Sequence, residues 1–246
     1  MNEIQKPDYN EFSDSRQVAL YDAFNSLGAD EEFFCGEVTK LSPSLVVDLG
    51  CGTGLLTCEL TRRGFNIIGI EPASEMLNLA RQKPYADKVR WIEGSHEKLH
   101  GLNADLVLMT SHVAQFFLED EDWEEMLKSA QNGLTSSGRL IFDSKNPLIK
   151  PWEKWSRKTS TKKVGQVERW YELTKVEGSR VRYEIHYLLE SGEELISNNE
   201  LVYRSEEEIT KSLLDAGFSV ESVYGDWDGS PFDATSPEMI FVAVRE

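Results

Sequence analysis

Short apolar runs alternate with amphipathic segments along the first 145 residues of the chain. Each run is four to six residues long and is bounded by Pro, Gly or charged residues, which is typical of buried parallel strands. The runs span residues 44–48, 65–70, 89–92, 104–109 and 138–142. Helical spacing between them, clearest from Asp120 to Gly133, predicts a parallel sheet with helices on both of its faces.

Residues 1–43 are expected to form helices that precede the first strand. Apolar positions recur at helical spacing from Glu11 to Leu27 and again from Glu31 to Lys40, before Pro43 ends the pattern. Between the second and third strands, Ser74 is expected to cap a helix that runs to about residue 82.

The pattern changes between residues 147 and 204, where no helical period is evident. Three segments there alternate apolar with polar positions, as antiparallel strands do. They span residues 166–175, 179–189 and 194–203. The insertion begins where the fifth strand ends, so we expect residues 147–204 to form a lid over the cleft at the carboxyl edge of the sheet.

The parallel pattern resumes after the insertion. Ser205 and Glu208 predict a capping box at the start of a helix, and strands are expected at 218–223 and 239–244. We therefore predict one domain over residues 1–246, in the α/β class. It contains a Rossmann-like, mostly parallel sheet of seven strands with helices on both faces, and an antiparallel β insertion after the fifth strand.

Aromatic residues are dense in the insertion and suit a cover over a partly apolar ligand. They include Trp152, Trp155, Trp170, Tyr171, Tyr183 and Tyr187. A shift of one residue in register reverses the faces of a strand, so the pattern leaves open whether Trp152 or Trp170 faces the cleft. Trp227, in the loop between the last two strands, is expected at the same opening.

The segment after the first strand carries the strongest chemical signal. Gly50, Gly52 and Gly54 lie between a predicted strand and a predicted helix. Glycines permit positive φ and let a ligand approach the backbone, while the start of a helix offers unpaired N–H groups. Glu71 ends the second strand, where a carboxylate can accept hydrogen bonds from both ribose hydroxyls of an adenosine cofactor.

The glycine spacing is G-x-G-x-G, one residue shorter than the dinucleotide pattern G-x-G-x-x-G. With Asp48 before it, the turn resembles the first motif of class I S-adenosylmethionine-dependent methyltransferases. Residues 69–77, 92–96 and 104–112 resemble further motifs of that family, although Ser95 stands where the family usually has an acid. The resemblance covers residues 40–145 and the two closing strands, and it implies S-adenosylmethionine as cofactor.

The resemblance also implies roles for individual side chains. The acid after the second strand would hold the ribose, apolar residues following it would flank the adenine, and a Tyr-Asp pair in the N-terminal helices would close over the cofactor. The implied cofactor contacts are Tyr21, Asp48, Gly50, Cys51, Gly52, Glu71, Pro72, Met76, Ser95, His96 and Thr110.

Methyl transfer is an in-line displacement that positioning alone can accelerate, and a base is needed only if the nucleophile must lose a proton. The acceptor is expected above the carboxyl ends of the fourth and fifth strands. His112 is the candidate general base there, and Asp143 is the candidate for orienting the acceptor. Packing or capping roles for both residues remain equally open.

Charge and composition limit the classes of molecule that the protein is expected to bind. With 26 basic and 43 acidic residues among 246, the net charge is −17, which disfavours nucleic acid and anionic membrane surfaces. The three cysteines and four histidines lack metal-ligand spacing, so no metal site is expected. The first twelve residues lack a signal-peptide pattern, which favours a cytoplasmic location. The oligomeric state is not predicted.

The favoured function is methyl transfer from S-adenosylmethionine to a nitrogen or oxygen nucleophile of a small molecule. The insertion and the Tyr-Asp pair resemble small-molecule methyltransferases, including those that methylate amino groups on sugars. Two alternatives stay open: a non-catalytic module that binds S-adenosylmethionine or a protein partner, and, less favoured by the glycine spacing, a nicotinamide-dependent oxidoreductase.

Overall fold

The computed structural model describes residues 6–246 and contains a seven-stranded sheet in the order β10-β11-β5-β4-β1-β2-β3. All neighbours pair in parallel except β11, which is antiparallel to both β5 and β10. The predicted mostly parallel sheet is therefore confirmed. Its strands are β1 (Val46–Leu49), β2 (Ile67–Glu71), β3 (Arg90–Glu93), β4 (Ala104–Met109), β5 (Leu134–Lys145), β10 (Phe218–Tyr224) and β11 (Glu238–Arg245).

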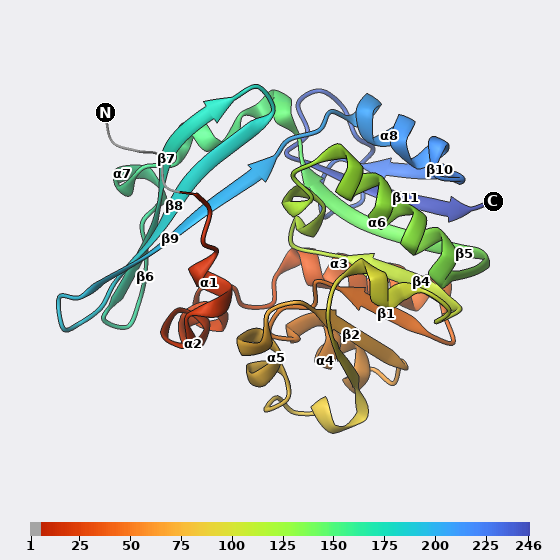
Figure 1. The fold of residues 1–246 in the computed structure, drawn as a ribbon, viewed down its shortest axis with the longest axis horizontal. Helices are drawn as coiled ribbons and strands as arrows, with labels where there is room; N and C mark the ends of the chain where they lie inside the picture. Colours follow the sequence, from red (N-terminus) through yellow and green to blue (C-terminus); the bar gives the residue numbers. More distant parts are fainter. Residues whose placement is uncertain (1–5) are drawn as a thin grey trace.

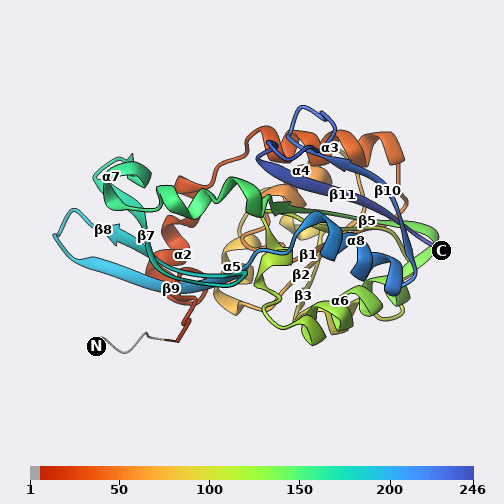
Figure 2. The ribbon, with the colours of Figure 1, turned by 90° about the horizontal axis from the view of Figure 1, so that it is seen from above.

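Helices cover both faces of this sheet, because neighbouring strand residues point to opposite sides. Val46 packs in one apolar cluster with α3 and α4, whereas Val47 packs in another with α6 and α8. Figure 2 shows the two pairs of helices on opposite sides of the sheet. The helices on the large sheet are α3 (Ala29–Leu41), α4 (Leu55–Arg62), α5 (Ser74–Ala80), α6 (Asp120–Gly133) and α8 (Glu206–Asp215).

The insertion forms a second sheet, antiparallel, in the order β6-β7-β8-β9 (Figure 1). Its strands are β6 (Lys162–Val164), β7 (Val167–Glu177), β8 (Arg180–Leu188) and β9 (Glu194–Val202), preceded by α7 (Arg157–Ser160). Short 3₁₀ turns complete the chain: η1 (Ala86–Lys88), η2 (His96–Leu99), η3 (Val113–Phe116), η4 (Pro147–Ile149) and η5 (Pro151–Lys154). The sheet stands beside the large sheet, over the N-terminal helices.

The two faces of this second sheet differ, and the difference settles the orientation of the tryptophans. Trp152 packs against Tyr203 at 4.5 Å between ring centroids, within the apolar cluster of the inner face. Trp170 lies on the outer face, where its ring stacks on His186 at 4.8 Å and the Arg157 guanidinium covers it at 4.2 Å. Trp152 therefore belongs to the face that covers the N-terminal helices, as does Trp155, which packs against Tyr183, whereas Trp170 does not.

The N-terminal region departs from the single helix expected over Glu11 to Leu27. It forms α1 (Asn10–Ser13) and α2 (Ser15–Phe24), and Leu27 lies beyond both. Asp14 breaks the helix because its backbone is extended and its side chain accepts a hydrogen bond from the Arg16 N–H at 2.9 Å, which caps α2. Of the helical region expected over residues 1–43, residues 1–5 lie outside the described part of the chain.

Other local predictions have mixed outcomes. The capping box is confirmed, since the Ser205 N–H donates to Glu208 Oε2 at 2.7 Å and Ser205 Oγ accepts from the Glu208 N–H at 3.3 Å. Ser74 does not cap α5; Ala73 holds that position, and α5 ends at Ala80 rather than near residue 82. Trp227 was expected at the cleft but packs against Phe33 and Phe34 of α3.

No helix within residues 6–246 has the length and apolar character that crossing a membrane requires.

The short helix α1 is held between the two sheets and buries a carboxylate there. The Asp8 N–H donates to the Asn198 carbonyl of β9 at 2.9 Å, and the Glu11 N–H donates to Ser197 Oγ at 3.0 Å. Glu11 is only 6% exposed, and no hydrogen bond reaches its carboxylate from any residue in the described range. Burial raises the pKa of Glu11 to about 8, against a smaller opposing effect of Arg169.

Replacement of Glu11 by Gln tests this burial. Because the folded-state pKa lies above the usual 4.5, the carboxyl opposes folding least below pH 4.5 and increasingly as the pH rises through 8. We expect Glu11→Gln to raise the Tm by roughly 2–4 °C more at pH 9 than at pH 4.5, measured by scanning calorimetry. Glu172→Gln, on the outer face of β7, should show no such difference. Equal effects of Glu11→Gln at both pH values would contradict the expectation.

Candidate active site

A cavity of about 500 Å³ lies at the carboxyl edge of the large sheet, beside α1 and α2. Its size is within the range of small-molecule sites. Seven of the side chains or backbone positions expected to contact a cofactor line it: Tyr21, Gly50, Gly52, Glu71, Pro72, Met76 and Ser95. Four do not line it: Asp48, Cys51, His96 and Thr110.

The glycine turn, residues 50–54, exposes its backbone to the cavity because no side chain covers it at Gly52. Gly50, Gly52 and Gly54 all have positive φ, at 76°, 55° and 74°. A Cβ at Gly50 or Gly54 would collide, at 2.6 Å, with Val113 or Trp91, so packing requires glycine there. A Cβ at Gly52 would meet only Met76 Cε at 3.5 Å. Gly52 therefore faces open space that a ligand can fill.

Glu71 is fixed at the edge of this space by two backbone donors. Its Oε2 accepts from the Gly52 N–H at 3.0 Å, and its Oε1 accepts from the Ala73 N–H at 2.9 Å. The side chain is 7% exposed, and burial raises the pKa of Glu71 above its usual value. Each carboxylate oxygen keeps a free lone pair for a hydroxyl of a ligand.

Asp48 and Cys51 lie behind the turn rather than in the cavity. Asp48 is 1% exposed, its Oδ2 accepts from Thr57 Oγ1 at 2.6 Å, and burial raises its pKa to about 6. Burial also raises the pKa of the Cys51 thiol well above its ordinary value, so it is not a nucleophile at neutral pH. Both residues support the turn from beneath.

The Tyr21-Asp22 pair joins α2 to the glycine turn. Tyr21 lines the cavity, while Asp22 Oδ1 accepts from Thr53 Oγ1 at 2.5 Å and Oδ2 forms an ion pair with Lys83. The pair thus links three segments around the cavity. Arg16, also on α2, lies on the surface and forms ion pairs with Asp14 and Glu193.

Ser95 reaches the cavity, but its neighbour His96 turns away, with Nδ1 3.1 Å from Ser129 Oγ. Thr110 does not line the cavity either, whereas Ser111 and Val113 of the same loop do. Sequence reasoning missed ten lining residues: Asp8, Tyr9, Phe12, Ser13, Leu49, Ala73, Ser111, Val113, Phe116 and Phe117. The aromatic pair at 116–117, in the segment between the fourth strand and the next helix, was the available signal.

The structure brings His112 and Asp143 together and adds Glu238. His112 Nε2 lies 3.1 Å from Asp143 Oδ2 and 3.0 Å from Glu238 Oε2, and Lys145 Nζ lies 2.7 Å from Glu238 Oε1. Burial raises the pKa of Asp143 to about 6. Neither predicted residue lines the cavity, although the neighbours of His112 do.

The same three side chains are the one set within residues 6–246 with metal-ligand spacing. One donor atom from each of His112, Asp143 and Glu238 lies within 4.8 Å of the others. The ammonium of Lys145 already neutralises one carboxylate of this set. The grouping joins segments far apart in the chain, so the spacing of residues along the sequence could not show it.

Several known proteins with similar sequences are described as methyltransferases. Residues 46–138 match the family model described as a methyltransferase domain. The cypemycin N-terminal methyltransferase of Streptomyces sp. is 24% identical over 241 residues, which cover 95% of this chain and 97% of that protein.

Solved structures show the same fold over nearly the whole chain. A methyltransferase from Clostridium acetobutylicum ATCC 824 has a TM-score of 0.78 at 17% identity, with 94% of this chain and 98% of that one covered. An amino pentose methyltransferase from Micromonospora echinaspora, solved with S-adenosylmethionine bound, has a TM-score of 0.68 at 21% identity, with 93% and 95% covered. Motif, sheet order and matched domain agree: the chain has the fold of S-adenosylmethionine-dependent methyltransferases, and residues 46–138 match the methyltransferase-domain family.

Proposed function

We propose that the protein transfers the methyl group of S-adenosylmethionine to an amine nitrogen of a small molecule. The observation that carries this proposal is the single cavity that joins the glycine turn and Glu71 to α1, α2 and η3. The names of the similar proteins favour nitrogen, since they describe an N-terminal methyltransferase and an amino pentose methyltransferase. Detection of a methylated amine by mass spectrometry, after incubation with amine-bearing metabolites, tests it.

The cofactor half of the cavity fits adenosine. Glu71 would accept the ribose hydroxyls, while Pro72 and Met76 would flank the adenine and Ser95 would meet its amino group. The open space at Gly52 would let the cofactor lie against bare backbone. When bound, S-adenosylmethionine supplies an activated methyl group, and the residues around it orient the nucleophile toward that group.

The second sheet would cover the acceptor half. Its inner face packs on Phe24 and Phe116, and Phe116 also lines the cavity. Apolar and aromatic side chains there would exclude water from the acceptor. Residues 147–204 would thus act as the lid that their place in the sequence predicts.

His112 would act on the loop after β4 rather than on the acceptor's proton. Ser111 and His112 both have positive φ, at 56° and 64°, which is costly for residues other than glycine. The contacts of the His112 ring with Asp143 and Glu238, together with the hydrogen bond from its N–H to Asp143 Oδ2 at 2.9 Å, would hold that conformation. The loop in turn places Ser111 and Val113 in the cavity wall.

Glu71→Ala should weaken the binding of S-adenosylmethionine by about 1.5–3 kcal/mol, because hydrogen bonds to a charged group are lost. Titration calorimetry measures the dissociation constant. Glu93→Ala is the matched control, because Glu93 pairs in register with Glu71 but is exposed on β3. An unchanged dissociation constant for Glu71→Ala would remove the ribose assignment.

Trp152→Ala should lower the rate of methyl transfer while leaving cofactor affinity nearly unchanged, since it removes packing from the inner face of the second sheet. Trp170→Ala deletes the same side chain from the outer face and should leave the rate unchanged. Single-turnover rates and calorimetric affinities compare the two. Equal losses of rate in both variants would contradict the proposed lid.

His112→Gln distinguishes the two roles open for this residue. A positioning role predicts a fall in kcat of less than about 10-fold, whereas loss of a general base costs roughly 10²–10⁴-fold. His100→Gln, at an exposed position after η2, is the control. A loss in the larger range, with Tm and cofactor affinity intact, would identify His112 as the base.

A further inference from the structure

Aromatic side chains from the N-terminal segment and from η3 form one wall of the cavity. This aromatic wall consists of Tyr9, Phe12, Tyr21, Phe116 and Phe117. Ring contacts connect four of its members: the Phe12 centroid lies 5.6 Å from that of Phe116 and 6.1 Å from that of Tyr21. The Tyr9 centroid lies 5.9 Å from that of Phe116. The proposed cofactor contacts use only Tyr21 of this wall, so the other rings are available to the acceptor.

The charged groups in the cavity lining are both acidic. Within residues 6–246, the charged side chains that line it are Asp8 and Glu71, and no Lys, Arg or His joins them. Glu71 is assigned to the ribose, which leaves Asp8, in the segment directly before α1. The cavity therefore favours a cationic or neutral occupant and disfavours an anionic one.

The carboxylate of Asp8 is fixed by neutral donors that leave its charge uncompensated. Its Oδ1 accepts from the N–H groups of Asn10 at 3.1 Å and Asn198 at 3.0 Å, and its Oδ2 accepts from Asn198 Nδ2 at 2.7 Å. These two uncharged residues are the side-chain partners of Asp8 within residues 6–246. A carboxylate offers about four lone pairs, so one remains on Oδ2 for a ligand.

An ammonium group matches this combination of a carboxylate and aromatic rings. It can donate an N–H to the remaining lone pair of Asp8 Oδ2, and its charge is attracted both to the carboxylate and to the faces of aromatic rings. Asp8 is exposed as well as lining the cavity, so it lies where the cavity opens to solvent. An exposed ion pair contributes up to about 5-fold in affinity, and a cation–π contact at such a site adds about 2-fold or more.

We propose that Asp8 and the aromatic wall bind a cationic amino group of the methyl acceptor, and that Asp8 thereby determines specificity for amines. The inference rests on the proposed function and adds to it the residues that recognise the acceptor. Asp8 acts on the binding of the acceptor rather than on the removal of its proton. The Asp8 N–H also donates to the Asn198 carbonyl at 2.9 Å, so strand β9 of the second sheet positions this carboxylate.

Probes of similar shape and different charge test the proposal in the full chain saturated with S-adenosylhomocysteine at pH 7. Benzylamine, benzyl alcohol and benzoate are a cation, a neutral molecule and an anion on one ring, and D-glucosamine with D-glucose is a second pair. Ligand-observed NMR titration measures the dissociation constants. For at least one pair we expect the amine to bind about 10-fold more tightly than the neutral probe, and benzoate to bind most weakly of its series.

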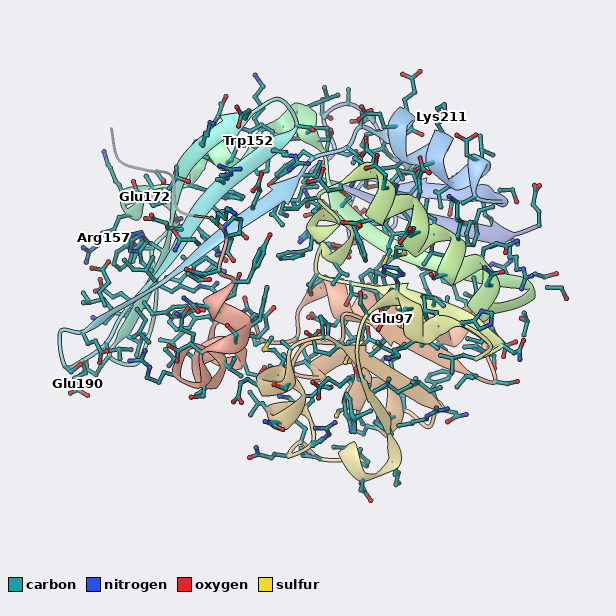
Figure 3. All side chains as sticks on the ribbon, in the orientation of Figure 1. Glu97, Trp152, Arg157, Glu172, Glu190 and Lys211 are labelled. Atoms are coloured by element: carbon teal, nitrogen blue, oxygen red, sulfur yellow. The ribbon has the colours of Figure 1, made fainter. Side chains whose placement is uncertain are left out.

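Variants of Asp8 assign this preference to its charge. Asp8→Asn should reduce the preference for the amine to about 2-fold, because the ion pair is lost while the aromatic wall remains. Asp8→Glu keeps the charge and should retain most of the preference. Glu190→Gln is the matched control, since it makes the same change in net charge at an exposed position in the hairpin between β8 and β9, at the outer tip of the second sheet (Figure 3).

The outcomes separate this proposal from the proposed function. Failure of S-adenosylhomocysteine to bind the unchanged chain would contradict the cofactor site itself. With that site intact, a preference for amines that persists in Asp8→Asn would overturn only the role of Asp8. Equal binding of charged and neutral probes, no binding of any probe, or loss of the preference in Asp8→Glu or Glu190→Gln would also overturn it. Unchanged affinity of Asp8→Asn for S-adenosylhomocysteine shows that the variant retains its fold.

Discussion

The hydrogen bond from the Gly52 N–H to the Glu71 carboxylate is the contact on which the rest of the site depends. It joins the loop after β1 to the end of β2, two parallel strands whose register pairs Asp48 with Gly69 and Leu49 with Ile70. The bond holds a carboxylate beside bare backbone, and only glycine tolerates the φ of that turn without cost. Buried support from Asp48 and Thr57 fixes the turn from below. The shape of the cavity at this edge therefore depends on three things: the positive φ of the glycine turn, the register of β1 with β2, and the position of the Glu71 carboxylate.

The second sheet meets this site through the N-terminal helices rather than through the large sheet directly. Phe24 of α2 packs in its inner cluster, while Asp22 of α2 bonds Thr53 of the glycine turn. The helix α1 adds backbone contacts to β9. Chain segments before β1 and after β5 thus converge over the same edge of the large sheet. The cavity itself is lined by the N-terminal segment and by the loops that follow the strands of the large sheet, within residues 8–117.

The sequence predicted those features of the fold that depend on residues close together in the chain. The strands, the glycine turn, Glu71 and the Ser205–Glu208 box all follow from neighbouring residues, and the structure contains each of them. The face of Trp170 could not be predicted, because it depends on register with His186 in another strand.

Contacts between distant parts of the chain were also beyond sequence reasoning. Glu238 reaches His112 across 126 positions, and Glu11 meets Ser197 across 186. Between α1 and α2, Asp14 interrupts an apolar period that otherwise favours one long helix, because its side chain caps α2.

The helix α1 connects the cavity to the second sheet. Its Phe12 lines the cavity, while the backbone N–H of the neighbouring Glu11 donates to Ser197 of β9. A substitution that displaces β9 would therefore also change the shape of the cavity wall, although β9 itself contributes none of the lining residues.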